Sequence, residues 1–407
     1  MTSDAAAAGD PTVLVLNGGS SSIRFAVFAA TSPPLLRLSG KLAPVGGTVP
    51  PTLRVRTPGG VPSEVPWKGG GDHRAAAAGL LDAIAAHPAT GRVRAIGHRL
   101  VHGMERHDPE RITPALLREL VRNVPFAREH LPREIELVRL AGRRFPGIPQ
   151  VACFDTAFHR TMPAVARLLP IPRRFTDAGV RRHGFHGISF SYLMEELLRI
   201  DPASRRKRVV LAHLGNGASL AAVRDGKGVD TTMGFTPTGG LMMGTRSGDL
   251  DPGVISWFAR DAGMSRAAID RMLDDGSGLL GVSGTSADMQ VLLGREASDP
   301  RAKEAVDLFC HLAKRWIGAM AAVLGGIDTV VFSGGIGENA PDVRSRICDG
   351  LEFLGITIDG RRNRAGSALI SKASGPVQVR VIATDEERMI ARSVMRAVGP
   401  EPPRSPR

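Results

Sequence analysis

The sequence has few aromatic residues, few cysteines and no long apolar run. Phe, Trp and Tyr make up 4% of the 407 residues, so the core must be built mainly from Val, Leu, Ile and Ala. No apolar run approaches the length of a membrane span, and residues 1–11 lack the basic and apolar regions of a secretory signal. The cysteines, with no metal or redox spacing, are expected to be buried thiols of a cytoplasmic protein: Cys153, Cys310 and Cys348.

The positive charge of the chain does not have the pattern of a nucleic-acid-binding protein. The formal net charge is +13 at pH 7, but the basic residues are scattered, with short clusters only at 205–208 and 361–364. No aromatic side chains alternate with these clusters to stack on bases. We therefore expect no nucleic-acid partner and no membrane partner, and a basic surface that attracts anionic substrates such as nucleotides.

Two glycine-rich segments share one pattern of apolar run, small-residue turn and second apolar run. They extend from Val13 to Val27 and from Val210 to Val223, and Gly18 of the first aligns with Gly215 of the second. Each pattern predicts a β-hairpin whose turn offers backbone N–H groups and hydroxyls to a phosphate. A third loop, 330–339, joins an apolar strand to a helix through two glycines. The repeat predicts a duplicated nucleotide-binding fold with a cleft between the halves.

The order of strands and helices predicts an α/β protein of two domains. The N-terminal domain is expected over 11–155 and the C-terminal domain over 156–385, with a last helix, 386–399, that returns to the first domain. Asp155 follows a short apolar strand, and the carboxyl ends of such strands are where open α/β sheets bind ligands.

An ordered set of motifs resembles the acetate/propionate kinase family, within the superfamily of actin, Hsp70 and sugar kinases. Unrelated chains would not carry the whole set in this order. The motifs lie between Val13 and Ala397, at 17–22, 97–103, 154–159, 181–187, 213–217, 233–237, 241–249, 332–339 and 384–387.

The resemblance implies two actin-like, ribonuclease H-like domains, each a mixed sheet flanked by helices, with the active cleft between them. It implies reversible transfer of the γ-phosphoryl group of ATP to a short carboxylate, acetate first, giving an acyl phosphate and ADP. It also implies a homodimer, for which we expect the apolar helix around 316–324 to supply the interface.

The family's catalytic residues map onto two arginines, a histidine and an aspartate. Arg99 and Arg246 match its two essential arginines, whose planar guanidinium groups suit phosphate and carboxylate. His186 matches the histidine that stabilises the transferring phosphoryl group. Asp155, Asn17 and Glu386 match the residues associated with Mg²⁺ (or Mn²⁺), a cation that prefers oxygen ligands.

Further residues are assigned to substrates by the same resemblance. The acceptor pocket would be formed by Arg99, Val101, Phe185 and Pro237, with His130 near it. The spacing of Thr384 and Glu387 is that of a capping box, which makes Glu387 structural. The predicted nucleotide-binding residues are Asn17, Arg24, His213, Gly215, Asn216, Gly217, Asp288, Gly334, Gly335, Ile336, Gly337 and Asn339.

Four positions depart from the usual family sequence. Arg24 replaces a lysine, Ile188 a threonine and Phe190 a histidine, and Glu129 aligns with a leucine of the acceptor pocket. A carboxylate there would repel a carboxylate substrate, unless Ala127 takes that position. The alternatives are therefore a kinase for propionate or another small carboxylate, or a nucleotide-binding homologue with weakened transfer.

Overall fold

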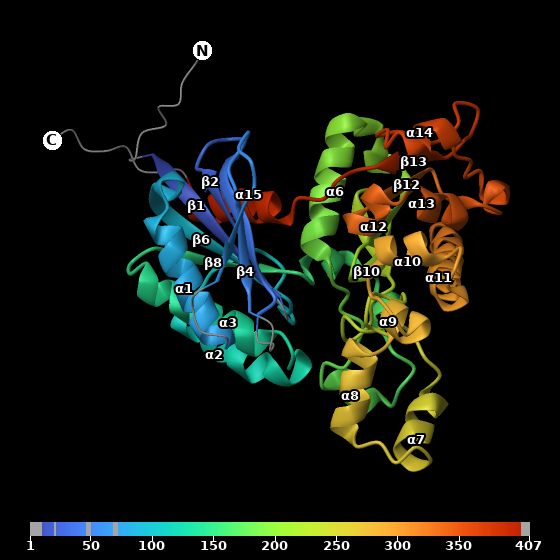
Figure 1. The fold of residues 1–407 in the computed structure, drawn as a ribbon, viewed down its shortest axis with the longest axis horizontal. Coiled ribbons are helices and arrows are strands. Elements are labelled where there is room, and N and C mark those ends of the chain that lie inside the picture. Colours follow the sequence, from blue (N-terminus) through green and yellow to red (C-terminus); the bar gives the residue numbers. More distant parts are fainter. Residues whose placement is uncertain (1–9, 20–21, 46–49, 68–71, 400–407) are drawn as a thin grey trace. The chain divides into compact units, whose positions relative to one another are not determined.

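The computed structural model describes residues 10–19, 22–45, 50–67 and 72–399, so Ser20 and Ser21 of the first predicted phosphate loop lie outside it. Its contacts divide the chain into two compact units. The N-terminal unit comprises residues 1–157 and 385–407, and the C-terminal unit comprises residues 158–384. The division predicted after Asp155 falls two residues before the division after residue 157. The units are shown as ribbons in Figure 1 and are described separately below.

The described part of the N-terminal unit contains one mixed sheet in the order β5-β4-β3-β2-β1-β6-β8-β7. The first five strands pair antiparallel, whereas β6 pairs parallel with β1 and with β8. Its strands are β1 (Pro11–Gly18), β2 (Ile23–Ala29), β3 (Leu35–Ala43), β4 (Thr52–Arg56), β5 (Ser63–Pro66), β6 (Arg92–Leu100), β7 (Glu110–Arg111) and β8 (Gln150–Phe154).

Helices cover both faces of this sheet. α1 (His73–Ala86) and α3 (Leu131–Arg144) pack their apolar residues on one face, and α2 (Pro114–Asn123) packs beside α3. α15 (Glu386–Val398) packs against β1 and β6 on the other face. The approach there is close: a Cβ on Gly97 would lie 2.5 Å from Ile390 and 2.6 Å from Val394. The last helix is therefore an integral layer of the N-terminal unit.

The C-terminal unit contains a second mixed sheet in the order β11-β10-β9-β12-β13. Its strands are β9 (Arg208–Leu214), β10 (Ala218–Arg224), β11 (Lys227–Thr231), β12 (Thr329–Ser333) and β13 (Gln378–Val381). α6 (Gly187–Ile200) packs its apolar side chains on β9 and β10, and α11 (Pro300–Leu324) also contacts these strands. The other helices are α4 (Ala164–Arg167), α5 (Arg173–Asp177), α7 (Pro252–Arg260), α8 (Arg266–Asp275), α9 (Gly278–Ser283), α10 (Met289–Arg295), α12 (Gly334–Asn339), α13 (Pro341–Cys348) and α14 (Gly360–Arg364).

The two sheets repeat one topology, which confirms the predicted duplicated α/β fold. In each, an antiparallel hairpin is followed by a third antiparallel strand on one side and by two parallel strands on the other. The hairpin registers differ, however. Gly18 pairs with Ile23, whereas its counterpart Gly215 lies in the turn that follows the pair Leu214 and Ala218. The second turn is one residue shorter, so the halves match in topology but not residue by residue.

Local sequence signals account for the starts of two helices. Asp72 caps α1 by accepting from the backbone N–H of Ala75, and Thr113 caps α2 by accepting from the backbone N–H of Leu116. All three cysteines are buried and free, as expected. No helix in the described ranges is both long and apolar enough to cross a membrane.

Candidate active site

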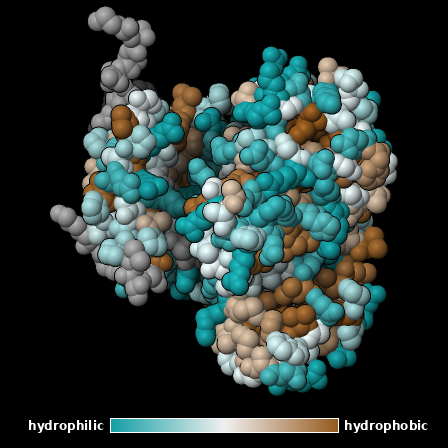
Figure 2. Space-filling view, turned by 45° about the vertical axis from the view of Figure 1, so that its right-hand side comes forward, coloured by the Kyte–Doolittle hydropathy of each residue, from teal (hydrophilic) through white to brown (hydrophobic). Residues whose placement is uncertain are grey.

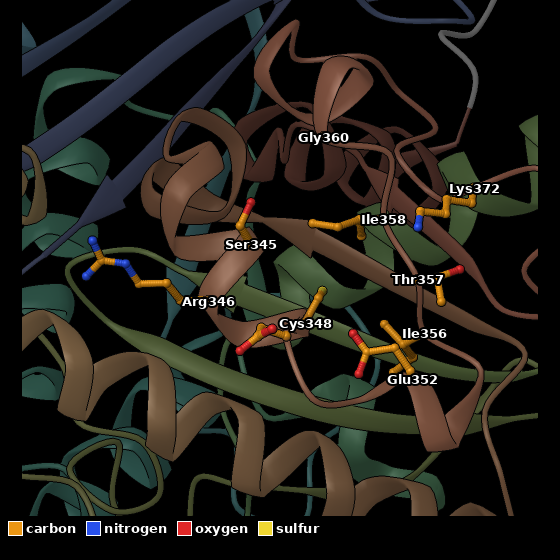
Figure 3. Close-up of a pocket in the computed structure, with 10 residues that line it drawn as sticks. Ser345, Arg346, Cys348, Glu352, Ile356, Thr357, Ile358, Gly360 and Lys372 are labelled. Atoms are coloured by element: carbon orange, nitrogen blue, oxygen red, sulfur yellow. The ribbon is translucent and has the colours of Figure 1, made fainter.

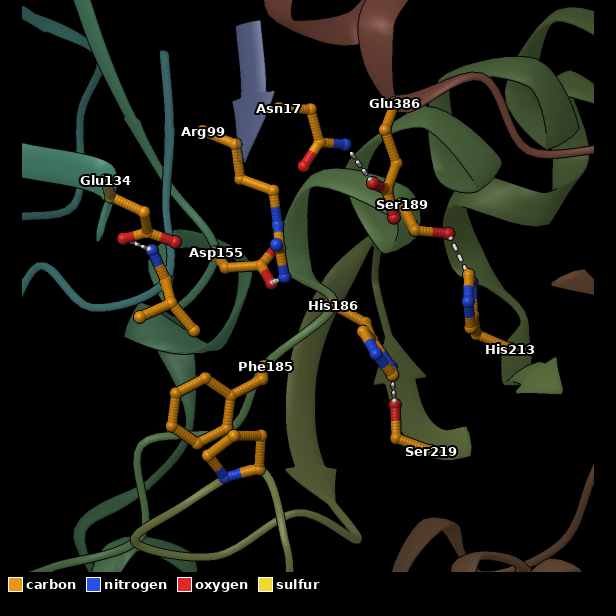
Figure 4. A network of polar contacts seen from close by, with 12 residues as sticks. Asn17, Arg99, Glu134, Asp155, Phe185, His186, Ser189, His213, Ser219 and Glu386 are labelled. Carbon is orange, nitrogen blue, oxygen red and sulfur yellow. Dashed lines mark hydrogen bonds and ion pairs between the residues drawn. The ribbon is translucent and has the colours of Figure 1, made fainter. Parts of the chain in front are cut away.

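Arg99 and Asp155 lie at the carboxyl ends of two neighbouring parallel strands. β6 and β8 are in register at Leu100 and Phe154, so the two side chains come together. Arg99 Nη2 donates to Asp155 Oδ2 at 2.6 Å, and Figure 4 shows the pair. The side chain of Asp155 is fully buried, and that of Arg99 is 15% exposed. Two residues singled out in separate motifs therefore form an ion pair within the N-terminal unit.

The cationic form of Arg99 is strongly favoured. Burial by itself lowers the pKa of a guanidinium, but the carboxyl groups of Asp155, Glu386 and Glu134 together raise the pKa of Arg99 above its ordinary value. Arg99 therefore carries a permanent positive charge among three carboxyl groups.

Asn17 holds two glutamates of α15. Its side-chain amide donates to Glu386 at 3.1 Å and to Glu387 at 3.3 Å. The predicted capping box is wrong, because Asp385 is the N-cap and accepts from the backbone N–H of Arg388. Burial, together with Glu386, raises the pKa of Glu387. Glu387 thus lies beside the residue predicted to bind metal instead of closing the helix end.

These residues suit a hard cation. Asp155, Glu386 and the amide oxygen of Asn17 are oxygen donors of the kind that Mg²⁺ accepts. Among the described residues, no three His, Cys, Asp or Glu side chains converge on one point. Mg²⁺ commonly uses one or two carboxylates together with phosphate oxygens and water, so a sparse protein ligand set fits it.

A buried carboxyl that the sequence did not single out lies close to Arg99. Glu134, in the first turn of α3, is 2% exposed and accepts from the backbone N–H of Val101 at 3.0 Å. Burial raises the pKa of Glu134 to about 8, although Arg99 and the Val101 N–H act in the opposite direction. Glu134 is therefore mostly protonated at neutral pH.

Two histidines in the C-terminal unit are each held by a hydrogen bond to a serine. His186, before α6, bonds through Nδ1 to Ser219 of β10 at 2.9 Å. His213, on β9, bonds through Nδ1 to Ser189 of α6 at 2.8 Å, and Ser189 also bonds to Thr384 at 2.8 Å. The imidazole centroids are 4.5 Å apart, and both bonds are drawn in Figure 4. The Nδ1 atom of each ring is therefore held by a serine hydroxyl.

The backbone of His186 is in the left-handed region, with φ 57° and ψ 23°. A non-glycine residue pays a conformational cost there, and such residues occur preferentially at functional sites.

Arg246 lies next to His186. A Cβ on Gly217 would be 3.1 Å from His186 Nε2 and 3.5 Å from Arg246 Nη1, so both groups flank the turn between β9 and β10. Arg246 Nη1 donates to the carbonyl of Pro237 at 3.3 Å. The C-terminal unit therefore gathers three predicted cationic or polar groups, His186, His213 and Arg246, at one glycine turn.

The third glycine loop is held by Glu338. Gly334 begins α12 with φ 76°, and a Cβ on it would lie 2.6 Å from the carbonyl oxygen of Leu214. Glu338 Oε1 accepts from the backbone N–H groups of Gly334 at 2.8 Å and Thr384 at 3.1 Å. The loop is thereby tied to the second phosphate turn and to the segment that enters α15.

The other predicted nucleotide-binding residues are spread around these loops. Gly335 N is 3.7 Å from where a Cβ on Gly215 would be, so the two glycine turns adjoin. Asn339 donates to the carbonyl of Gly335. Asn216 packs on Gly244, where a Cβ would overlap its side-chain oxygen. Asp288 is exposed and caps α10, while Ile336 and Gly337 are part of α12.

The predicted acceptor residues come from both units. Val101 follows β6 in the N-terminal unit and is 1% exposed. Phe185 belongs to the C-terminal unit with Pro237, is 1% exposed, and its carbonyl bonds to His159 Nε2 at 2.9 Å.

Two of the four departures have a structural account. Phe190 is fully buried in the core between α6 and the sheet, where its ring contacts Phe158 and His159. The histidine it replaces is thus exchanged for apolar packing. Arg24 is exposed opposite Asn17 in the first hairpin and acts on Glu387, whose pKa it lowers against the effect of burial.

Glu129 is exposed, whereas Ala127 is 8% exposed. We therefore expect Glu129→Leu to leave the kcat/KM ratios for acetate, propionate and butyrate within about twofold of those of the wild type, because an exposed carboxylate is screened by water. Steady-state kinetics with the three acceptors check this. A larger rise for one acceptor would mean that Glu129 reaches the acceptor after all.

One cavity lies away from all these residues. Figure 3 shows this space of about 410 Å³, lined by α13 and the segment around Ile356 and Ile358. Its charged side chains have both signs, Arg346 and Lys372 against Asp349 and Glu352. None of the predicted site residues lines it, so it has no part in the candidate active site.

Sequence reasoning missed the residues that hold others in place. Glu338 lies inside the motif 332–339, whereas Ser189 and Ser219 each lie two residues beyond a motif, at 181–187 and 213–217. Their signal was a polar residue close to each predicted ligand. The sequence around Glu134 gave only one indication of its role, namely that this glutamate stands among apolar residues of an amphipathic helix.

Known proteins resemble this chain along nearly all of its length. The Acetokinase family model matches residues 12–392. An acetate kinase of Rhodopseudomonas palustris is 41% identical over 391 residues, covering 94% of this chain and 98% of that protein. A propionate kinase of Citrobacter rodentium is 38% identical over 96% of this chain and 98% of its own length.

Solved structures of acetate and propionate kinases are also similar to this chain over nearly all of its length. An acetate kinase of Porphyromonas gingivalis is 35% identical with a TM-score of 0.86, covering 96% of this chain and all of that one. A propionate kinase of Francisella tularensis is 34% identical with a TM-score of 0.89, covering 95% of this chain and all of that one. The chain therefore belongs to the acetokinase family.

Proposed function

We propose that this chain transfers the γ-phosphoryl group of ATP to a short-chain carboxylate, acetate first, and catalyses the reverse reaction. The observation that carries the proposal is the gathering of His186, His213 and Arg246 beside the Gly217 turn. Membership of the acetokinase family supports it. A second candidate acceptor is propionate, since relatives named propionate kinase match almost as well.

The chemistry requires position and charge more than a covalent intermediate. An acceptor carboxylate oxygen attacks the γ-phosphorus, the new O–P bond forms, and the bond to the β-phosphate oxygen breaks as ADP leaves. No proton must be moved, because the attacking carboxylate is already ionised. Arg99 would orient the acceptor, while Arg246 and His186 Nε2 would stabilise negative charge on the three equatorial oxygens.

The nucleotide would be held by the second and third glycine loops. Their backbone N–H groups and His213 would contact the phosphates, and residues 334–339 with Asp288 the adenosine. Mg²⁺, or Mn²⁺, when bound, neutralises charge on the phosphate oxygens. Asp155, Glu386 and Asn17 would hold it. ATP as substrate and buried free thiols suit a cytoplasmic location.

The proposal is tested by trapping acyl phosphate with hydroxylamine. The protein, ATP and Mg²⁺ are incubated with formate, acetate, propionate or butyrate, and hydroxamate is measured against a reaction without acceptor. We expect acetate or propionate to give the highest rate. If ATP binds but no acceptor yields hydroxamate above background, the chain is instead a nucleotide-binding homologue without transfer activity.

We further propose a homodimer, but not through the segment expected from the sequence. The apolar residues of α11 at Ile317, Met320 and Leu324 are buried in the core of the unit. α7, by contrast, has no buried residue, and Leu250, Val254 and Trp257 near it are exposed by 45%, 37% and 54%. Figure 2 shows apolar surface at this end of the C-terminal unit. An apolar patch is complementary to itself, which suits a twofold interface.

The expected result is a dimer mass by light scattering at micromolar concentration, which Trp257→Asp converts to a monomer. A buried charge without a partner is unfavourable enough to separate the subunits. Val323→Asp is the matched control, because Val323 is a similarly exposed apolar residue, 46%, on α11. A monomeric wild type would reject the dimer, and an unchanged Trp257→Asp dimer would reject this interface.

A further inference from the structure

Glu134 is a buried carboxyl group close to Arg99 that the proposed mechanism does not use. Its Oε2 accepts from the backbone N–H of Val101, and its Oε1 is buried with no hydrogen bond among the described residues. Figure 4 shows this carboxyl beside the Arg99–Asp155 pair. Removing a buried carboxyl from water is costly, so a glutamate here calls for a physical reason.

The reason begins with the backbone that Glu134 holds. β6 ends at Leu100, and Val101 is the first residue beyond the strand. Its N–H would be buried and unsatisfied without Glu134, because the Val101 residue is 1% exposed. The same short segment carries Arg99, which precedes Val101 by two residues. The bond therefore fixes the chain that presents both predicted acceptor-binding side chains.

Charge supplies the second part of the reason. Arg99 is already paired with the buried Asp155 at 2.6 Å. If Glu134 were ionised, it would add a negative charge to the carboxyl groups of Asp155 and Glu386 that already act on Arg99, and an incoming carboxylate would be repelled more strongly. As a neutral acid, Glu134 satisfies the Val101 N–H without adding negative charge.

We propose that Glu134 is a positioning residue for the acceptor: its hydrogen bond to the Val101 N–H holds the end of β6 so that Arg99 and Val101 meet the carboxylate. This rests on the proposed function. The predicted nucleotide contacts lie mostly in the C-terminal unit, so the KM for ATP is an internal reference that Glu134 does not reach.

The first test compares Glu134→Ala and Glu134→Gln with the wild type. We expect Glu134→Ala to raise the KM for acetate or propionate about tenfold, since it leaves the Val101 N–H unsatisfied. The KM for ATP should stay within about twofold. Glu134→Gln keeps a neutral acceptor for the N–H and should restore the acceptor KM to near the wild-type value. Glu136→Ala, two residues along α3 and 23% exposed, is the matched control.

The second test measures the KM for the acceptor as a function of pH in the wild type and in Glu134→Gln. It does not need Glu134→Ala, so it remains available if that variant fails to fold. The charged groups that act on Glu134 are Arg99 of β6 and Asp155 after β8. As Glu134 ionises above about pH 8, the wild-type acceptor KM should rise, whereas the Glu134→Gln profile should stay flat over that range.

Two results would overturn the inference in an active wild type. One is a Glu134→Ala enzyme whose KM values for acceptor and ATP change together or not at all. The other is the same alkaline rise in Glu134→Gln as in the wild type. A wild type that forms no acyl phosphate would instead refute the proposed function, so the two failures are distinguishable.

Discussion

Arg99→Ala and Arg246→Ala should each lower kcat by roughly 10²–10³ while leaving the fold intact. Removing one preorganised charge from an enclosed site typically costs a rate factor of this order. Neither arginine packs in an apolar core: Arg99 bonds to Asp155, and Arg246 contacts the carbonyl of Pro237 and the sulfur of Met243. Arg99→Ala also leaves the buried Asp155 without its partner, so its transfer rate is compared on protein that is shown to be folded.

Hydroxamate rates and circular dichroism on the same preparations check this result. Arg94→Ala, on the same strand as Arg99, and Arg266→Ala, an 88% exposed arginine on α8, are the controls and should retain wild-type rates. If Arg99→Ala or Arg246→Ala transfers phosphate within about threefold of the wild-type rate, its catalytic assignment is wrong.

Arg344→Met should destabilise the C-terminal unit by roughly 3–5 kcal/mol. Arg344 is 1% exposed, and its guanidinium donates to Asn363 and to the carbonyls of Gly337 and Glu338 at 2.7–2.9 Å. Each buried acceptor left without a donor costs about 1–3 kcal/mol, with partial relaxation. Because Gly337 and Glu338 belong to α12, the KM for ATP should rise as well.

Urea unfolding followed by tryptophan fluorescence measures the free energy of unfolding of the C-terminal unit, if Trp67 of the N-terminal unit is first replaced by Phe in every variant. The remaining tryptophans, Trp257 and Trp316, both lie in the C-terminal unit and report on it. Arg346→Met is the control, since Arg346 is 35% exposed and forms surface pairs with Glu296 and Asp307. Such pairs contribute up to about 1 kcal/mol. If Arg344→Met and Arg346→Met lose the same free energy of unfolding, the buried hydrogen bonds of Arg344 contribute no more to stability than the surface ion pairs of Arg346.

The fold could be predicted from the sequence because its determinants are local. Strand–turn–strand patterns at 13–27 and 210–223 and the strand before Gly334 fix the topology through short-range periodicity. Arg99 and Asp155 could each be singled out in advance because each follows an apolar strand, but their ion pair is a finding of the structure, in which β6 and β8 are neighbours.

The predictions that failed concerned residues whose hydrogen-bond or packing partner lies far away in the sequence. Thr384 does not cap α15 because its hydroxyl bonds to Ser189, 195 residues earlier. The apolar positions of α11 were assigned to an interface, but the sheet and α13 bury them. Glu129 and Glu134 lie five residues apart, and only the turn of α3 decides which carboxyl is buried beside Arg99. Propensity and spacing carry no information on these choices.

The position of α15 has a consequence for how the protein is made. α15 follows the whole C-terminal unit in the chain, although the sheet that α15 covers is synthesised first. The N-terminal domain commonly folds first during synthesis, but here the N-terminal unit lacks one of its layers until the C-terminal unit has been made. Until α15 is available, Gly97 and its neighbours on β6 lack the helix that packs on them. A chain cut short before Glu386 would retain a folded C-terminal unit attached to an unfinished sheet, a natural target for chaperones and proteases.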